Sequence, residues 1–77
     1  MGDHIERDLG QALKWYKKSA ESGLARAQSS LGEMYEFGAG TKKDFKEAIN
    51  WYPKAAEQND YKAMYRLARM YEKGIGY

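Results

Sequence analysis

The segment WYKKSAE at residues 15–21 returns as WYPKAAE at residues 51–57, and this recurrence decides the organisation of the whole chain. Shifting the sequence against itself by 36 residues gives 14 identical pairs among the 33 compared from Asp8 to Gly40, far more than unrelated segments share. The chain is therefore two copies of one structural unit. The identical pairs are Asp8/Asp44, Ala12/Ala48, Trp15/Trp51, Tyr16/Tyr52, Lys18/Lys54, Ala20/Ala56, Glu21/Glu57, Ala27/Ala63, Leu31/Leu67, Met34/Met70, Tyr35/Tyr71, Glu36/Glu72, Gly38/Gly74 and Gly40/Gly76.

Apolar residues in each copy recur at the spacing of amphipathic helices. Ala27, Leu31, Met34 and Tyr35 lie three or four positions apart or directly adjacent, which places them on one helical face. This stripe predicts a helix over residues 25–37 and its copy over residues 61–73, which we name helix A. A second stripe predicts helices over residues 8–22 and 44–58, which we name helix B. The expected order is B, A, B, A, and residues 1–7 are expected to form a flexible tail.

Residues at the expected helix ends support these boundaries. Asp44 with Glu47, and Asp8 with Gln11, have the spacing of a capping box at a helix start. Gly23 and Asn59, at equivalent positions, tolerate the left-handed conformation that follows many helices. Pro53 stands inside the second helix B, where it removes a backbone donor, so we expect a bend or a break near Tyr52.

The pattern Leu31-Gly32-x-x-Tyr35-x-x-Gly38-x-Gly40, followed by Trp51-Tyr52-x-Lys54-Ala55-Ala56, resembles the Sel1-like repeat (SLR), a relative of the tetratricopeptide repeat. The resemblance extends from Asp8 to Gly76 and implies an all-α fold: a right-handed α-α superhelix, or tetratricopeptide-like solenoid, of about four antiparallel helices. Members of the family serve as adaptors and scaffolds in protein complexes. The resemblance implies no reaction, and the lack of Cys places the chain outside the cysteine-rich branch.

Composition bounds the remaining possibilities. A chain of 77 residues holds one small domain, here expected over residues 8–77. A net charge of +2 is too small for a dedicated nucleic-acid binder, and zero Cys excludes disulfides and thiolate metal sites. No cofactor or metal is expected. The N-terminus has no apolar signal-peptide region and no run is long enough to span a membrane, so we expect a cytoplasmic protein or a fragment of a longer one.

Catalytic constellations are not evident. His4 has no acidic or nucleophilic companion placed by a fold element, and Gly38-x-Gly40 is better explained as a repeat turn than as a phosphate loop. Most aromatic residues recur with the repeat, so we expect Trp15, Tyr16, Tyr35, Trp51, Tyr52 and Tyr71 to pack between helices. Phe37 and Tyr65 do not recur, which singles them out as candidate ligand contacts.

The face of helix A opposite its apolar stripe is the candidate binding site. In tetratricopeptide-like folds the corresponding face lines a concave groove, so the resemblance implies a protein or peptide ligand there. The two copies differ mostly on this face, which suits a tailored surface, although drift of exposed residues would give the same difference. Phe37 and Tyr65 are the expected apolar anchors, with Arg26, Lys62 and Arg69 attracting acidic groups. The candidate residues are Arg26, Ser29, Glu33, Glu36, Phe37, Lys62, Tyr65, Arg69, Glu72 and Lys73.

A different class of function stays open. The complete hairpin is helix A followed by helix B over residues 25–58, and the outer helices flank it as unpaired halves. Repeat arrays usually need about three units for stability, so pairing with a second copy to form a homo-oligomer would complete the solenoid. Excision of the chain from a longer array would explain the same feature.

Overall fold

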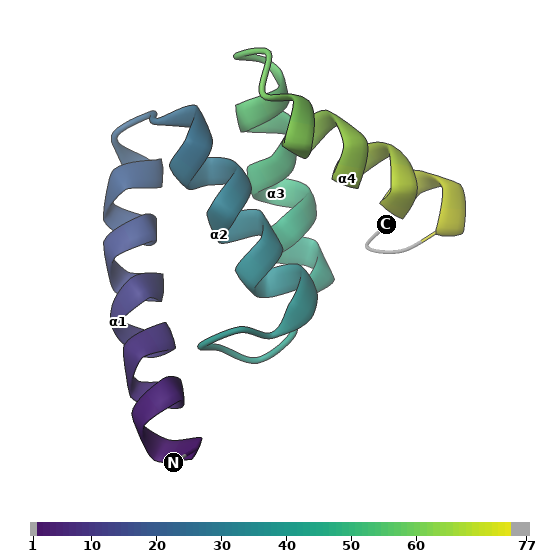
Figure 1. The fold of residues 1–77 in the computed structure, drawn as a ribbon. Coiled ribbons are helices and arrows are strands. Elements are labelled where there is room, and N and C mark those ends of the chain that lie inside the picture. The colour runs from purple at the N-terminus through teal and green to yellow at the C-terminus, as the bar shows by residue number, and fades with distance from the viewer. Residues whose placement is uncertain (1, 75–77) are drawn as a thin grey trace.

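The computed structural model describes the backbone of residues 2–74 and the side chains of residues 8–74. Four helices account for nearly all of this part of the chain: α1 (Gly2–Glu21), α2 (Ala25–Phe37), α3 (Phe45–Ala56) and α4 (Tyr61–Lys73). No strand is present among the described residues, which agrees with the expected all-α class. Figure 1 shows α2 between α1 and α3, with α4 crossing the end of α3.

The two A helices have the expected bounds, and α3 lies within the range expected for the second helix B. The first helix differs, because α1 begins at Gly2 and residues 2–7 are helical instead of forming the expected tail. Asp8 therefore lies inside a helix and is not its N-cap, contrary to the prediction from the Asp8–Gln11 spacing. No proline stands between Gly2 and Asp8, so the backbone donors and the helical path are not interrupted there.

The other helix ends follow local chemistry. The Asp44 carboxylate caps α3 by accepting a hydrogen bond from the Glu47 backbone N–H at 3.2 Å. The Asp44 N–H donates to the Tyr35 carbonyl at 2.8 Å, so the reciprocal half of a capping box is replaced by a bond to α2. Gly23 and Asn59 take left-handed φ angles of 97° and 68°, as predicted for residues that end the two B helices.

Pro53 does not break α3. The helix is continuous from Phe45 to Ala56 with the proline inside it, so the expected break near Tyr52 is wrong. The proline stands close to the C-terminal end, and its carbonyl still accepts the Glu57 N–H at 2.9 Å. Tyr52 and Ala55 on either side are fully buried, and this packing holds the helical path despite the missing donor.

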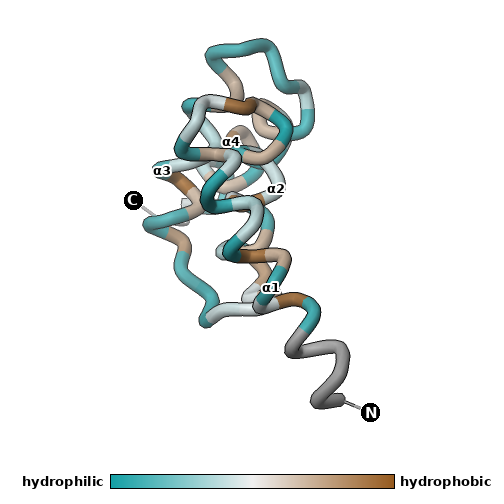
Figure 2. The backbone as a smooth tube through the Cα atoms, turned by 90° about the vertical axis from the view of Figure 1, so that its left-hand side faces the viewer, coloured by the Kyte–Doolittle hydropathy of each residue, from teal (hydrophilic) through white to brown (hydrophobic). Residues whose placement is uncertain are grey.

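The core consists of two clusters of buried residues, arranged along the stack of helices. One joins α1 to α2 and contains Ala20, Ala27 and Leu31. The other joins α3 to α4 and contains Ala48, Tyr52, Ala55, Ala63 and Met70. Figure 2 shows the corresponding pattern along the chain, in which short apolar segments alternate with hydrophilic ones as in amphipathic helices.

Tyr52 is the largest fully buried side chain, and its ring lies directly on the backbone of α2. A Cβ atom at Gly32 would come within 2.6 Å of the ring, so only glycine fits at this position. The Tyr52 hydroxyl donates a hydrogen bond of 2.6 Å to the Glu36 carboxylate. Burial, followed by this hydrogen bond, raises the pKa of Tyr52 far above its ordinary value.

Two aromatic residues that were expected in the core are exposed. Trp15 is 69% exposed and Tyr71 is 48% exposed, whereas their counterparts Trp51 and Tyr35 pack against the core clusters. In the middle hairpin α2 and α3 pack closely on each other; α1 has no preceding helix A and α4 no following helix B among the described residues. The same repeat position is therefore buried where a neighbouring helix covers it and exposed where the described residues contain no such helix.

None of the four helices in the described part of the chain has the length and apolar character that a membrane span requires.

Candidate functional site

The junction of α2 with α4 is built around Asp60, which caps α4. One carboxylate oxygen accepts the Ala63 N–H at 2.9 Å, and the other lies 3.2 Å from the Ser29 hydroxyl. The same hydroxyl lies 3.0 Å from the Arg26 carbonyl. Ser29 is fully buried by these contacts, so it joins the two A helices and does not belong to the exposed face on which it was predicted.

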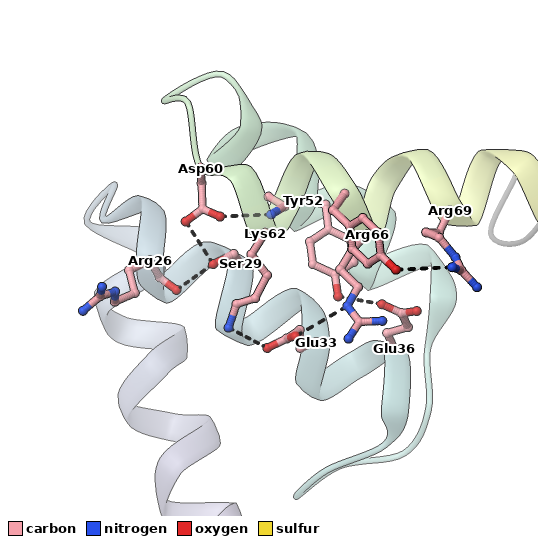
Figure 3. Close-up of polar contacts among 11 residues, drawn as sticks. Arg26, Ser29, Glu33, Glu36, Tyr52, Asp60, Lys62, Arg66 and Arg69 are labelled. Carbon is pink, nitrogen blue, oxygen red and sulfur yellow. Dashed lines mark hydrogen bonds and ion pairs between the residues drawn. The ribbon is translucent and has the colours of Figure 1, made fainter.

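Glu33 ties the same two helices together further along. Its carboxylate accepts a hydrogen bond from Lys62 at 3.0 Å and lies 3.6 Å from the Arg66 Nε atom (Figure 3). The Arg66 Nε is enclosed and makes no hydrogen bond, so the ion pair with Glu33 is what balances its charge. Glu33 of α2 and Lys62 of α4 therefore form an ion pair with each other.

Cationic and aromatic side chains stack beyond this ion pair. The Arg66 guanidinium lies 4.9 Å from the centre of the Phe37 ring and 5.7 Å from that of Tyr65. Arg69 lies 5.8 Å from the Tyr65 ring centre and donates to the Tyr65 hydroxyl at 3.2 Å. Distances of this order correspond to cation–π attraction, which fixes these long side chains on the surface. Phe37 and Tyr65 remain 55% exposed.

Two hollows open beside Phe37. The larger, which we name the α1 groove, has a volume of about 530 Å³ and is lined by Leu9, Ala12, Tyr16, Ser30, Glu33, Met34, Phe37, Ala39 and Lys62. The smaller, which we name the cationic hollow, has a volume of about 100 Å³ and is lined by Glu36, Phe37, Arg66, Arg69, Met70 and Lys73. Three cations line the cationic hollow against one carboxylate, and that carboxylate already accepts the Tyr52 hydroxyl.

The predicted site residues are thus only partly brought together. Glu33, Glu36, Phe37, Lys62, Tyr65, Arg69 and Lys73 form one surface, which we name the α2/α4 face. Arg26 is exposed at the N-terminal end of α2, turned away from Glu36 and Arg69 in Figure 3. Glu72 is exposed on α4 and lines neither hollow.

The prediction omitted Arg66, which pairs with Glu33 and stacks on Phe37 and Tyr65. At 100° per residue the position of Arg66 falls between those of Lys62 and Met70, so a complete helical wheel of residues 61–73 would have included it. The wall that α1 contributes to the α1 groove was also missed. It depends on how α1 packs against α2, which no pattern within one helix reports.

Nothing in the described residues groups three or more His, Cys, Asp or Glu side chains in a way that would hold a metal ion. The arrangement offers apolar surface, cation–π stacks and hydrogen-bonding groups, which are means of binding.

Comparisons with known proteins agree with this architecture. The family model named Sel1 repeat matches residues 1–24, 25–60 and 62–77, so its middle match coincides with the α2–α3 hairpin and each outer match with a single helix. A Sel1 repeat protein from Oxalobacter formigenes is 48% identical over 87% of this chain, with a TM-score of 0.84. The protein c5321, a protective antigen present in uropathogenic Escherichia coli strains and displaying an SLR fold, is 37% identical over 88%, with a TM-score of 0.86.

The chain spans 28% and 15% of the lengths of these two proteins. No curated protein matches it. The likeness to both structures confirms the expected tetratricopeptide-like, all-α solenoid. Because the Sel1 repeat model matches nearly every residue, the chain belongs to the Sel1 repeat family.

Proposed function

We propose that this chain is a non-catalytic protein-interaction module that binds a protein or peptide through the α2/α4 face. Repeats of the Sel1 family generally act as protein-interaction scaffolds and are typically non-catalytic. The observation that carries the proposal is the pair of half-exposed aromatic rings, Phe37 and Tyr65, which are held in place by Arg66 and Arg69. Exposed aromatic and Arg side chains are the residue types that most often dominate binding energy at protein interfaces.

The ordering of these side chains before any partner arrives supports the same function. Stacking of Arg66 on Phe37, and the Arg69–Tyr65 hydrogen bond, fix side chains that would otherwise lose freedom on binding. Ion pairs of Glu33 with Lys62 and Arg66 hold α2 against α4. The face is a fixed surface on two helices, and fixed surfaces bind with a smaller entropic cost.

Selection from a peptide-display library tests the proposal. We expect peptides selected on the unmodified chain to lose at least tenfold in affinity for a Phe37→Ala/Tyr65→Ala variant. A Leu24→Ala/Tyr71→Ala variant removes two exposed apolar side chains that line neither hollow and is the matched control. Circular dichroism verifies that both variants fold. Failure to select any peptide, or equal loss in both variants, would contradict binding through the α2/α4 face.

Self-assembly is the second candidate function, and the exposure of Trp15 favours it. Pairing α4 of one copy with α1 of another would repeat the α2–α3 hairpin between molecules. The repeat position that is Gly32 in α2 is Ala68 in α4, and this difference opposes the arrangement. A Cβ atom at Gly32 would collide with the Tyr52 ring, so the Ala68 methyl group would collide with the Tyr16 ring of the second copy in the same way. Sedimentation equilibrium over a hundredfold range of concentration separates the two functions: a monomer throughout excludes self-assembly.

A further inference from the structure

The net positive charge of the chain is concentrated on the α2/α4 face. Thirteen Lys and Arg and eleven Asp and Glu give the whole chain a formal charge of +2. This face, with Arg66 included, holds four of these cations and two of the carboxylates: Lys62, Arg66, Arg69, Lys73, Glu33 and Glu36. The other nine cations of the chain are matched by nine carboxylates. The excess charge of the chain therefore lies on this one surface.

The cations on this face differ in how far their charges are paired. Lys62 pairs with Glu33 at 3.0 Å, and the Arg66 Nε atom lies 3.6 Å from the same carboxylate. Arg69 donates its hydrogen bond of 3.2 Å to a neutral tyrosine hydroxyl, and neither Arg69 nor Lys73 forms an ion pair with a described residue. Both of these side chains line the cationic hollow, so the unpaired charge of the face lies there.

The cationic hollow lies between α2 and α4, and its walls come from these two helices. Its volume of about 100 Å³ has room for a group of a few heavy atoms. The one carboxylate in its lining, that of Glu36, is held by the hydrogen bond from the Tyr52 hydroxyl at 2.6 Å. Three cations remain around the space, so an anion of this size is the favoured occupant.

Aromatic rings fix the guanidinium groups at the rim of the hollow. Arg66 lies over the Phe37 ring at 4.9 Å from its centre, and Arg69 lies over the Tyr65 ring at 5.8 Å. The planar fork of a guanidinium group matches the two oxygens of a carboxylate. Asp and Glu are the anions that an unmodified protein partner presents. The rim therefore combines donors suited to a carboxylate with exposed apolar ring surface beside them.

We propose that the cationic hollow binds the side-chain carboxylate of an Asp or Glu in an acidic peptide segment that lies on the α2/α4 face. Arg69 and Lys73 contact the carboxylate, and Arg66 adds positive charge from the same wall. An apolar side chain of the peptide packs on the exposed ring of Phe37. The inference rests on the proposed function and names the chemistry of its partner.

A pair of synthetic peptides tests the carboxylate directly. The acidic peptide acetyl-AEFEA-amide and its neutral isostere acetyl-AQFQA-amide differ only in the two side-chain charges, and their blocked ends carry none. In NMR titrations at low salt we expect the acidic peptide to bind at least tenfold more tightly, because hydrogen bonds to a charged group contribute more than neutral ones. The side-chain Nε–H signal of Arg69 should shift with the acidic peptide and stay in place with the neutral one.

Two protein variants with the same loss of charge locate the site. Arg69→Gln should reduce the preference for the acidic peptide to about threefold or less, and the affinity for the neutral peptide should stay within about twofold. Arg26→Gln is the matched control, because Arg26 is exposed on α2 and does not line the hollow. It should keep the full preference. Arg69 is also exposed, and circular dichroism verifies that both variants fold.

The possible results separate this inference from the proposed function. Equal affinity for the two peptides, or an equal preference in the two variants, overturns the carboxylate site and leaves the proposed function to the display selection. Lack of binding by both peptides overturns it as well. A third peptide, with one phosphoserine and one glutamine in place of the glutamates, carries about the same charge as the acidic peptide. Tighter binding of this third peptide would assign the hollow to phosphate instead of a carboxylate.

Discussion

Tyr52 in α3 and Tyr16 in α1 are the same residue of the same repeat in different surroundings. Tyr52 lies between Gly32 and α4, fully buried, with its hydroxyl bonded to Glu36. Tyr16 packs on α2 from one side and borders the α1 groove on the other. A repeat residue therefore acquires its role from the neighbouring helix as well as from its own sequence. The same position is fully buried in one copy and half-buried beside a groove in the other.

The largest expected effect comes from truncating the buried tyrosine. Tyr52→Ala should lower the free energy of unfolding by about 3–5 kcal/mol, because it leaves a large cavity in the core. This approaches the whole stability of about 3–5 kcal/mol that a single core supplies to a chain of this size, so the variant should be largely unfolded. Tyr16→Ala should cost about 1–2 kcal/mol. Urea unfolding followed by circular dichroism measures both, and equal costs would contradict the difference in burial.

Gly32 and Ala68 give the next comparison. Gly32→Ala adds a methyl group within 2.6 Å of the Tyr52 ring, and overpacking of about 3 kcal/mol should outweigh the gain of about 1 kcal/mol in helix propensity. A net loss of about 2 kcal/mol is expected in thermal unfolding. Ala68 is exposed, so Ala68→Gly should cost only the propensity difference of about 1 kcal/mol. A more stable Gly32→Ala variant would show that the ring moves aside freely.

The two aspartate caps should also differ. Asp44→Ala removes one cap from α3 and should cost about 1 kcal/mol. Asp60→Ala removes the cap of α4 and also an acceptor for the buried Ser29 hydroxyl, so a loss of about 1.5–2 kcal/mol is expected. Restoring the cap alone with Asp60→Ser should recover part of this loss. Equal costs at the two caps would show that the Ser29 contact contributes nothing.

Alkaline pH tests the Tyr52–Glu36 contact. The pKa of Tyr52 is raised in the folded protein, so above about pH 10 the unfolded chain loses a proton that the folded chain keeps. Stability is therefore complete below that pH and falls as pH rises, by about 1.4 kcal/mol at pH 11 from this group. The Tyr52→Phe variant should lack this part of the fall between pH 8 and pH 11. An identical pH dependence in both proteins would contradict the assigned environment.

Much of the fold was predictable because its signals are local. The stripe around Leu31 and the left-handed positions at Gly23 and Asn59 place helices and their ends within a few residues. The start of α1 was not predictable from Asp8, whose spacing to Gln11 imitates a cap. The exposure of Trp15 was missed because the recurrence of a residue indicates its usual role in the repeat. Recurrence does not indicate whether the helix that would cover the residue is present.

The placement of the candidate residues was predictable in outline, with Ser29 as an exception, and their role in binding stays a prediction. Phe37, Tyr65 and Arg69 lie where the helical wheel places them. Ser29 is buried because Asp60, from another helix, reaches its hydroxyl, and a wheel of one helix cannot contain that contact. Arg66 was absent from the prediction although its own wheel position indicated it.

Amide chemical-shift mapping with a display-selected peptide is the most direct test of binding through the α2/α4 face, since it reports on backbone amides along the whole chain in one experiment. We expect the largest shifts on the α2/α4 face, around Phe37, Tyr65 and Arg69, and we expect them to disappear in the Phe37→Ala/Tyr65→Ala variant. Shifts confined to α1, or spread evenly over the chain, would contradict binding through that face.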